Sequence, residues 1–148
     1  IEEKLKKEVG QEKDKFLRLF AEFENYKRRT SKERIELFKT ANEELMTVLV
    51  PILDDFDRGL NELRKSKDEE LLVGMELISN KLKNSLTQKG LSPINVEQGD
   101  TFDVELHEAI TQIPAPSKDL KGKVVDVIEK GYTLNGKVIR FAKVVVGK

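Results

Sequence analysis

Apolar residues in the first third of the chain recur at intervals of three and four positions. They are Leu5, Val9, Phe16, Phe20, Phe23, Tyr26, Phe38, Ala41, Leu45 and Leu49. This spacing places them along one face of an α-helix. Residues 1–49 also contain a single glycine and no proline. We therefore predict a helix over residues 1–49, about 75 Å long if it is unbroken.

The apolar stripe of this predicted helix is too narrow to stabilise the helix alone. It is also interrupted at residues 27–34 by the polar sequence KRRTSKER. A long helix of this kind needs a partner helix, and the simplest partner is the same helix in a second copy of the chain. We expect residues 1–49 to form a long paired helix, similar to a coiled coil, in a homodimer.

A second helical region follows Pro51, where we expect the helix to kink or restart because proline lacks a backbone N–H and crowds the preceding turn. The sequence SKDEE then predicts a turn, with Ser66 or Asp68 as the N-cap of a further helix. Gly90 is a natural residue to end that helix. Two antiparallel helices with one apolar face each do not enclose a core, but two such hairpins form a four-helix bundle. Residues 50–90 therefore predict the hairpin of a dimeric bundle.

The apolar faces that we expect a second chain to cover lie on all of these helices. The predicted dimer contacts are Phe16, Phe20, Phe23, Leu45, Leu49, Ile52, Phe56, Met75, Ile78 and Leu82. Gly74 stands among good helix formers, where a glycine costs about 1 kcal/mol relative to alanine. That cost suggests the close approach of another backbone, within the bundle or from a partner. The alternative is that the glycine is merely tolerated.

After Gly90 the pattern changes to short β-branched runs separated by glycine and proline. The runs KVVDVIEKGYTL and KVIRFAKVVV flank Asn135-Gly136, a dipeptide that strongly favours a tight hairpin turn. We predict a small all-β domain over residues 91–148. The complete pattern predicts an α+β fold with a long paired N-terminal helix, a dimeric four-helix bundle and a small C-terminal all-β domain.

Composition favours long, solvent-exposed helices over a compact enzyme. Charged residues make up 36% of the chain and aromatic residues 6%, against about 25% charged residues in typical domains. Formal net charge is zero, but acids outnumber bases over residues 50–108 and bases outnumber acids over residues 121–148. This uneven distribution suits protein partners of complementary charge better than nucleic acid.

Cysteine is absent, so neither disulfides nor thiolate metal sites are available. No apolar run approaches the roughly 18 residues that cross a membrane. Ile1 is followed by charged residues and not by the apolar core of a signal peptide. We expect an intracellular protein, and because the first residue is not methionine, we expect further residues to precede it.

The residues that carry chemistry in enzymes lack their usual arrangements here. His107 is the only histidine, and Thr111 stands where a zinc-binding HExxH motif needs its second histidine. We interpret His107 as a surface or packing residue. The cluster Asp54, Asp55 and Asp57 is interpreted as a solvated acidic helix face. P-loop, GxGxxG and GxSxG motifs are absent as well, so we expect no catalytic residue, no cofactor, no metal site and no enzyme activity.

Two basic stretches are candidates for partner contacts. Residues 27–34 carry five bases and one acid, which indicates either an electrostatic contact or a solvated part of a charged helix. Nucleic-acid binding is less favoured because the nearby aromatics belong to the apolar stripe. Lys137 and Arg140 follow the predicted hairpin turn. Bases on a stiff hairpin are well placed for an acidic partner, but charges that protect an edge strand are equally common.

Three stretches of the sequence together resemble the GrpE family, the nucleotide exchange factors of bacterial DnaK-type chaperones. They are AEFENYKRRT at 21–30, LVPILDDFDRGL at 49–60 with GMELI at 74–78, and FDVELHEAI at 102–110 with GYTLNGKVIRFAKVVV at 131–146. The last pair is similar to the family's C-terminal signature, except at Val104, where proline is usual. The resemblance covers nearly the whole chain.

The resemblance implies a cytoplasmic bacterial homodimer that binds the nucleotide-binding domain of a DnaK-type chaperone. It implies that the dimer opens the chaperone's cleft and speeds ADP release in protein folding and the stress response. Binding of nucleotide, nucleic acid or membrane by this chain is not implied. By matching positions, the partner-binding residues are Lys27, Gly74, Ile128, Lys137 and Arg140. Glu36 replaces a base found in some relatives, so the contact is not extended to it.

Two other functions remain open from the residues alone. The first is a structural coiled-coil adaptor with a β docking domain and no effect on nucleotide. The second is a nucleic-acid binder that uses residues 27–34, for which affinity would fall steeply with salt.

Overall fold

The computed structural model describes all residues from Ile1 to Lys148, which divide into two compact units, Ile1–Lys39 and Thr40–Lys148. The first unit is essentially one helix, α1 (Glu2–Thr40), which continues through Gly10 and buries none of its residues. Ion pairs at spacings of three and four, such as Lys15 with Glu12 at 2.9 Å, run along it. Such pairs contribute only about 0.2–0.5 kcal/mol each, so α1 gains little stability from its own side chains.

The second unit begins with a helix that starts earlier than predicted. Helix α2 (Glu43–Ser66) runs through Pro51 without restarting there, so of the two outcomes expected at Pro51, a kink or a restart, the restart is wrong. The chain instead turns at Ala41–Asn42, and the Asn42 carbonyl accepts the first helical hydrogen bond from the Met46 N–H at 2.8 Å. Packing explains the outcome, because buried residues on either side of the exposed proline hold its turn in the helix.

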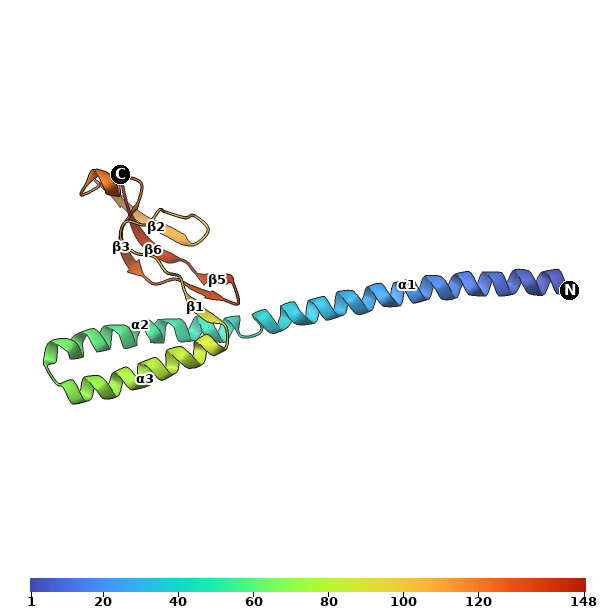
Figure 1. The fold of residues 1–148 in the computed structure, drawn as a ribbon, viewed down its shortest axis with the longest axis horizontal. Coiled ribbons are helices and arrows are strands. Elements are labelled where there is room, and N and C mark those ends of the chain that lie inside the picture. Colours follow the sequence, from blue (N-terminus) through green and yellow to red (C-terminus); the bar gives the residue numbers. More distant parts are fainter. The chain divides into compact units, whose positions relative to one another are not determined.

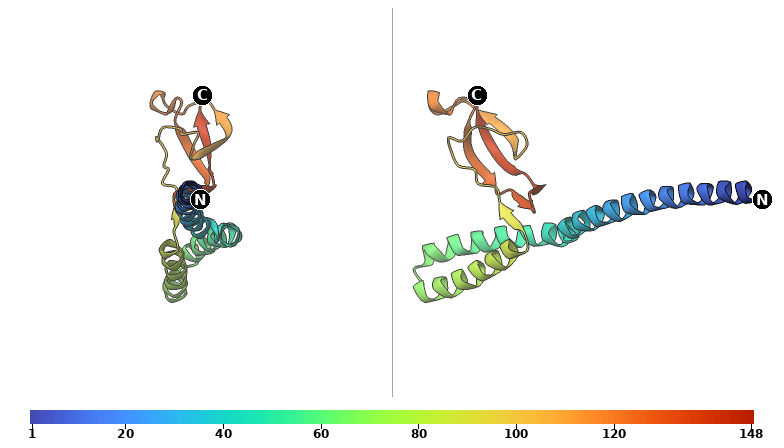
Figure 2. Two further views of the ribbon diagram at one scale, coloured as in Figure 1. Left: turned by 90° about the vertical axis from the view of Figure 1, so that its right-hand side faces the viewer. Right: turned by 45° about the vertical axis from the view of Figure 1, so that its right-hand side comes forward.

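The hairpin of α2 and α3 (Glu69–Gln88) follows the sequence signals at both ends of α3 (Figures 1 and 2). The Asp68 side chain accepts a hydrogen bond from the Leu71 N–H at 3.1 Å, which confirms Asp68 as the N-cap. At the other end Gly90 adopts a φ of 100°, and its N–H donates to the Thr87 carbonyl. That confirms Gly90 as the residue that ends the helix.

Six short strands form two three-stranded sheets. The strands are β1 (Leu91–Pro93), β2 (His107–Ile113), β3 (Val124–Glu129), β4 (Tyr132–Leu134), β5 (Lys137–Arg140) and β6 (Ala142–Gly147), with a 3-10 helix at Lys118–Leu120. The first sheet has the order β1-β4-β5 and is antiparallel. The second has the order β2-β6-β3, with β2 parallel and β3 antiparallel to β6. The α+β fold class is confirmed.

The hairpin between β4 and β5 turns at the predicted dipeptide. Asn135 has a φ of 49° and Gly136 a φ of 86°. Positive φ at both central positions is the geometry of the tight hairpin turn that matches strand twist. The predicted hairpin is therefore confirmed, with Leu134 opposite Lys137.

Two hydrophobic clusters hold the second unit together. The first joins the helical hairpin to the β1-β4-β5 sheet and contains Met46, Val50, Leu53, Leu86, Leu91, Tyr132 and Leu134. The second contains Ile94, Val124, Ala142, Val144 and Val146, none of which lies on α2 or α3. Apolar packing therefore fixes the first sheet to the helices and gives the second sheet a core of its own. None of the three helices is both long enough and apolar enough to cross a membrane.

Candidate functional site

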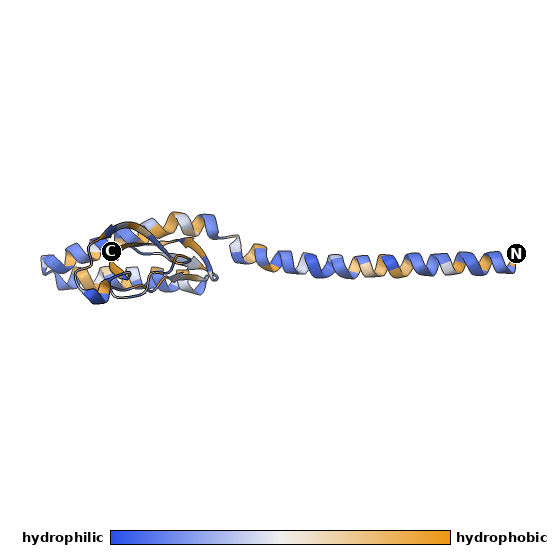
Figure 3. Ribbon diagram, turned by 90° about the horizontal axis from the view of Figure 1, so that it is seen from above, coloured by the Kyte–Doolittle hydropathy of each residue, from blue (hydrophilic) through white to orange (hydrophobic).

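Helix α1 presents its apolar stripe to solvent. Phe16, Phe20 and Phe23 are 66%, 54% and 57% exposed, and the rings of Phe16 and Phe20 lie 6.3 Å apart. Hydropathy colouring shows apolar residues recurring along the helix (Figure 3). Isolated exposed apolar residues are common, but a continuous stripe of aromatic side chains is typical of an interaction surface.

The other predicted dimer contacts lie on the helical hairpin in three different environments. Leu45, Ile52 and Ile78 are exposed, and Phe56 and Met75 are half-buried. Leu49 and Leu82 are half-buried against the chain's own first cluster. Further exposed apolar residues on α2 and α3 that the prediction omitted are Val48, Leu71, Val73 and Leu77. Val73 and Leu77 fall between the positions of the main stripe, whereas Val48 and Leu71 fit the three-and-four spacing and were still omitted.

Gly74 has no close neighbour within the chain. A Cβ atom built on this residue would meet nothing within 4 Å. Close approach of the two helices of one hairpin is therefore not the reason for this glycine. A surface outside the chain, or simple tolerance, remains as its explanation.

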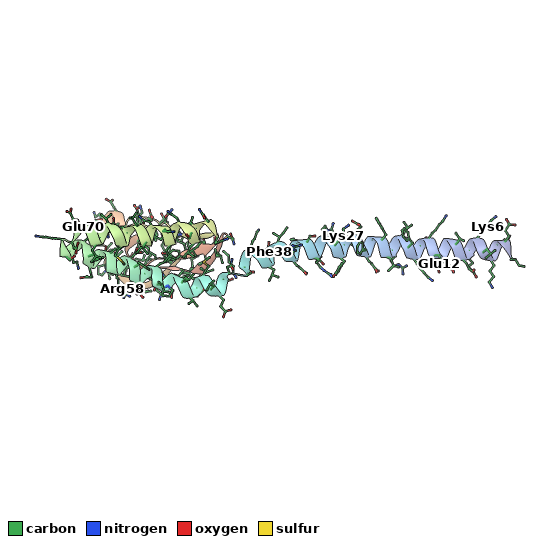
Figure 4. All side chains as sticks on the ribbon, turned by 90° about the horizontal axis from the view of Figure 1, so that it is seen from below. Lys6, Glu12, Lys27, Phe38, Arg58 and Glu70 are labelled. Atoms are coloured by element: carbon green, nitrogen blue, oxygen red, sulfur yellow. The ribbon has the colours of Figure 1, made fainter.

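Lys27 and Ile128 are both accessible. Lys27 extends from α1 (Figure 4), with its Nζ 3.5 Å from Glu24 and 5.5 Å from the centre of the Phe23 ring. Ile128 on β3 is 55% exposed. Neither side chain is held by a buried contact, so both are available to a partner.

Lys137 stands at the start of β5, directly after the hairpin turn. Its Nζ lies 2.9 Å from a carboxylate oxygen of Glu43, in the first turn of α2. The lysine side chain remains largely exposed. The hairpin tip is therefore attached to α2 by an exposed ion pair, a type of contact that contributes about 0–1 kcal/mol.

Arg140 is the most highly connected of the predicted site residues. Its Nη1 and Nη2 donate to the two carboxylate oxygens of Asp54 at 2.6 and 2.9 Å. Its Nη1 also lies 3.3 Å from Glu129, and its Nε donates to the Lys130 carbonyl at 2.9 Å. The guanidinium lies over the Tyr132 ring. Burial by itself would lower the pKa of Arg140, but the hydrogen bond and charge of Asp54 raise it instead.

Asp57, one turn further along α2, holds two lysines. It lies 2.7 Å from the Nζ of Lys83 on α3 and 3.1 Å from that of Lys130. Burial by itself would raise the pKa of Asp57, but the hydrogen bonds and charges of the two lysines outweigh that effect and lower it.

The interpretation of Asp54 and Asp57 as a solvated acidic face is therefore wrong. Of the three aspartates, only Asp55 is exposed, and it pairs with Arg58 on its own helix. The partners of Asp54 and Asp57 on the β domain lie 86 and 73 residues away in sequence. No local pattern marks contacts of that range. The sequence shows two acids three residues apart and a basic C-terminal segment, but it does not show that these acids and bases pair.

His107 is a packing residue, as one of the two interpretations proposed. It is 6% exposed, its Nδ1 accepts a hydrogen bond from the Asp103 N–H at 3.1 Å, and its ring lies 5.9 Å from that of Phe102. These contacts close the loop before β2. No group of three or more His, Cys, Asp or Glu side chains is arranged to hold a metal ion.

Comparison with known proteins relates this geometry to one family. Residues 2–148 match the family model described as GrpE. A protein named Protein GrpE from Parabacteroides distasonis is 48% identical over 147 residues, which cover 99% of this chain and 75% of that protein. Its namesake from Bacteroides thetaiotaomicron is 44% identical over 155 residues, covering 99% and 80%. The Oceanobacillus iheyensis protein of the same name is 39% identical over 145 residues, covering 98% and 75%.

Proposed function

Because the chain belongs to the GrpE family, we propose that it is a co-chaperone that releases ADP from a DnaK-type chaperone. It would bind the chaperone's nucleotide-binding domain, hold its cleft open and speed nucleotide exchange in protein folding and the stress response. The match of the family model over residues 2–148 is the observation that carries this proposal.

An exchange factor of this kind need not touch the nucleotide. It needs only to bind the open cleft more tightly than the closed, ADP-bound cleft. The coupling is reciprocal, so the factor by which the protein weakens ADP binding equals the factor by which ADP weakens binding of the protein. A coupling free energy of about 3 kcal/mol corresponds to roughly 150-fold. Tighter binding of the exchange factor to the open cleft than to the closed cleft is sufficient to supply this coupling free energy.

The proposed contacts lie on both structural units. On the β domain, Lys137 at the hairpin tip and exposed Ile128 offer a basic and an apolar contact on pre-organised strands. On α1, Lys27 offers a second base. Gly74 offers a flat stretch of α3, since no atom of the chain occupies the space beside it. Arg140 is a weaker contact candidate because its guanidinium is already bound within the chain.

The protein is proposed to act as a homodimer. The exposed aromatic stripe of α1 and the exposed apolar residues of α2 and α3 support this proposal, because a second copy would cover both. In that arrangement residues 1–49 would form the paired helix, residues 50–90 the bundle, and residues 91–148 the partner-binding domain.

The direct test measures the release of a fluorescent ADP analogue from a DnaK-type chaperone after mixing with excess unlabelled nucleotide. The proposal expects the release rate to rise with the concentration of this protein and then saturate. No acceleration at saturating concentration would refute the exchange function. Binding without acceleration would favour the alternative of a structural adaptor.

Lys137→Glu tests the hairpin contact in the same assay. We expect weaker chaperone binding with unchanged helix content and unchanged self-association, because the side chain is exposed. Lys121→Glu is the matched control, since it makes the same charge change at another exposed position of the β domain. Equal chaperone affinity of the Lys137→Glu variant and the control at low salt would show that the hairpin tip makes no such contact.

A further inference from the structure

We propose that the ion-pair network around Arg140 is the joint that fixes the β2-β6-β3 sheet relative to α2, and that Arg140 and Asp54 are positioning residues for nucleotide release. The first part concerns the free protein. The second part rests on the proposed function. A protein that holds a cleft open must keep its contact surface in a fixed position relative to its helices. A defined connection between the helices and the β domain is therefore needed.

Apolar packing links the β2-β6-β3 sheet to the helices only indirectly, through Val138 of β5, which packs against the core of that sheet. The first cluster attaches only the β1-β4-β5 sheet to the helices, and the core of the β2-β6-β3 sheet contains no residue of α2 or α3. Figure 1 shows the β1-β4-β5 sheet next to α2 and the other sheet beyond it. Exposed Ile128, a proposed contact, lies on β3 of that outer sheet. Its position relative to the helices therefore depends on what links the two sheets.

The chain crosses between the two sheets three times, through residues 94–106 between β1 and β2, through residues 130–131 between β3 and β4, and at Phe141 between β5 and β6. The last two crossings are short, because only Lys130 and Gly131 separate β3 from β4, and only Phe141 separates β5 from β6. The two crossings touch, because a Cβ on Gly131 would lie 2.4 Å from the Ala142 nitrogen and 2.8 Å from the Arg140 oxygen. These two short connections form a line about which one sheet can turn relative to the other.

Arg140 spans this line. It is the last residue of β5, and its guanidinium binds Asp54 on α2, Glu129 at the end of β3, and the Lys130 carbonyl beside Gly131. One side chain thus connects the helix, the end of the outer sheet and the crossing itself. Its side chain is 19% exposed. A bidentate arginine–carboxylate pair fixes orientation as well as distance, which a lysine cannot do.

Asp57 and Lys130 make a second connection across the same line. Asp57 on α2 binds Lys130, and it is itself held by Lys83 of α3. Asp54 and Asp57, which make the two connections, lie one turn apart on the same face of α2. Lys143 on β6 is different, because it pairs only with Glu129 inside the outer sheet. Its removal therefore leaves every link to the helices in place, which makes it the matched control.

The first experiment measures the joint without any chaperone. The chain has no cysteine, so spin labels can be placed on Asn80→Cys in α3 and Glu108→Cys in β2, both exposed. Mixing with excess unlabelled chain leaves one labelled chain per assembly. We expect a narrow distance distribution that broadens with Arg140→Gln or Asp54→Asn and stays narrow with Lys143→Gln. A distribution that stays narrow in the Arg140 and Asp54 variants would overturn the proposal.

The second experiment separates positioning from contact. In the ADP-release assay, Arg140→Lys should lower the saturating release rate at least about fivefold and change the half-saturating concentration less than about twofold. The charge is retained, but the bidentate geometry is lost. Arg140→Gln should lower the saturating rate further, and Lys143→Gln should match the wild type. A raised half-saturating concentration with an unchanged saturating rate would show that Arg140 is a contact residue, and would overturn the positioning role.

Failure of this inference is distinguishable from failure of the proposed function. A wild-type protein that does not speed ADP release refutes the exchange function, while the spin-label distances still test the joint. An active wild type with unaffected Arg140 variants refutes only the positioning role. Circular dichroism checks that each variant keeps its helix content. If Arg140→Gln does not fold, the milder Arg140→Lys and Asp54→Asn variants test the proposal.

Discussion

Replacing Ser79 by alanine should stabilise the protein. Ser79 on α3 is 1% exposed, and its Oγ has no hydrogen-bond partner. It lies on the same helix face as Leu82 and Leu86, which pack in the first cluster. A buried polar group without a partner is expected to cost free energy that a hydrogen bond would otherwise offset.

The magnitude follows from that environment. An unsatisfied buried hydroxyl costs about 1–3 kcal/mol, and alanine adds a few tenths of a kcal/mol in helix propensity, roughly. Ser79→Ala should therefore raise the free energy of unfolding by about 1 kcal/mol or more. For a domain of about this size, that corresponds to roughly 2–4 °C in Tm per kcal/mol.

Ser85→Ala provides the matched control. Ser85 lies on the same helix but is exposed, and its Oγ donates to the Lys81 carbonyl at 2.8 Å. This control should change stability by less than about 0.5 kcal/mol. Urea unfolding followed by circular dichroism, at one fixed chain concentration, compares the two variants. A destabilised Ser79→Ala would refute the reasoning, because it would mean that the hydroxyl has a partner in the assembled protein.

Three further outcomes are expected. Asp57 has a lowered pKa in the folded chain, so its carboxylate stabilises the fold above its ordinary pKa of 3.8, and this stabilisation is lost as pH falls through the lowered pKa. In urea unfolding, the Asp57→Asn variant should be least stable relative to the wild type at about pH 7, and the difference in the free energy of unfolding should become smaller in acid. Gly131→Ala should cost about 1–3 kcal/mol in the same unfolding assay, because the added Cβ would overlap the Ala142 backbone. Phe20→Ala should weaken self-association at least about tenfold in sedimentation equilibrium, since burying a phenylalanine is worth about 1.5–3 kcal/mol. An unchanged association constant would mean that the α1 stripe does not pair.

The features that sequence predicted well are those that depend on local chemistry. Asn135-Gly136 allows positive φ at two successive positions, Asp68 caps the next helix turn, and Gly90 ends that helix. Each effect acts over a few residues, so each is readable from the residue types. The apolar spacing of α1 is readable for the same reason.

The features that sequence did not predict depend on contacts between distant segments. Pro51 remains inside α2 because the neighbouring turns are packed against a sheet that follows much later in the chain. Asp54 and Asp57 were interpreted as solvated because their partners lie on another domain. The close approach at Gly131 was not predicted either, although a glycine separates two β-branched runs there, since the approach exists only when both sheets are formed.

We propose that this protein weakens ADP binding to a DnaK-type chaperone by binding the open cleft. The most direct measurement is the rate of ADP release from that chaperone at saturating concentrations of this protein. We predict acceleration, and we predict that at equilibrium ADP weakens binding of the protein to the chaperone by the same factor by which the protein weakens ADP binding, within the usual coupling range of about 5–150-fold. Tight binding with an unchanged release rate, or affinity that does not depend on ADP, would contradict it.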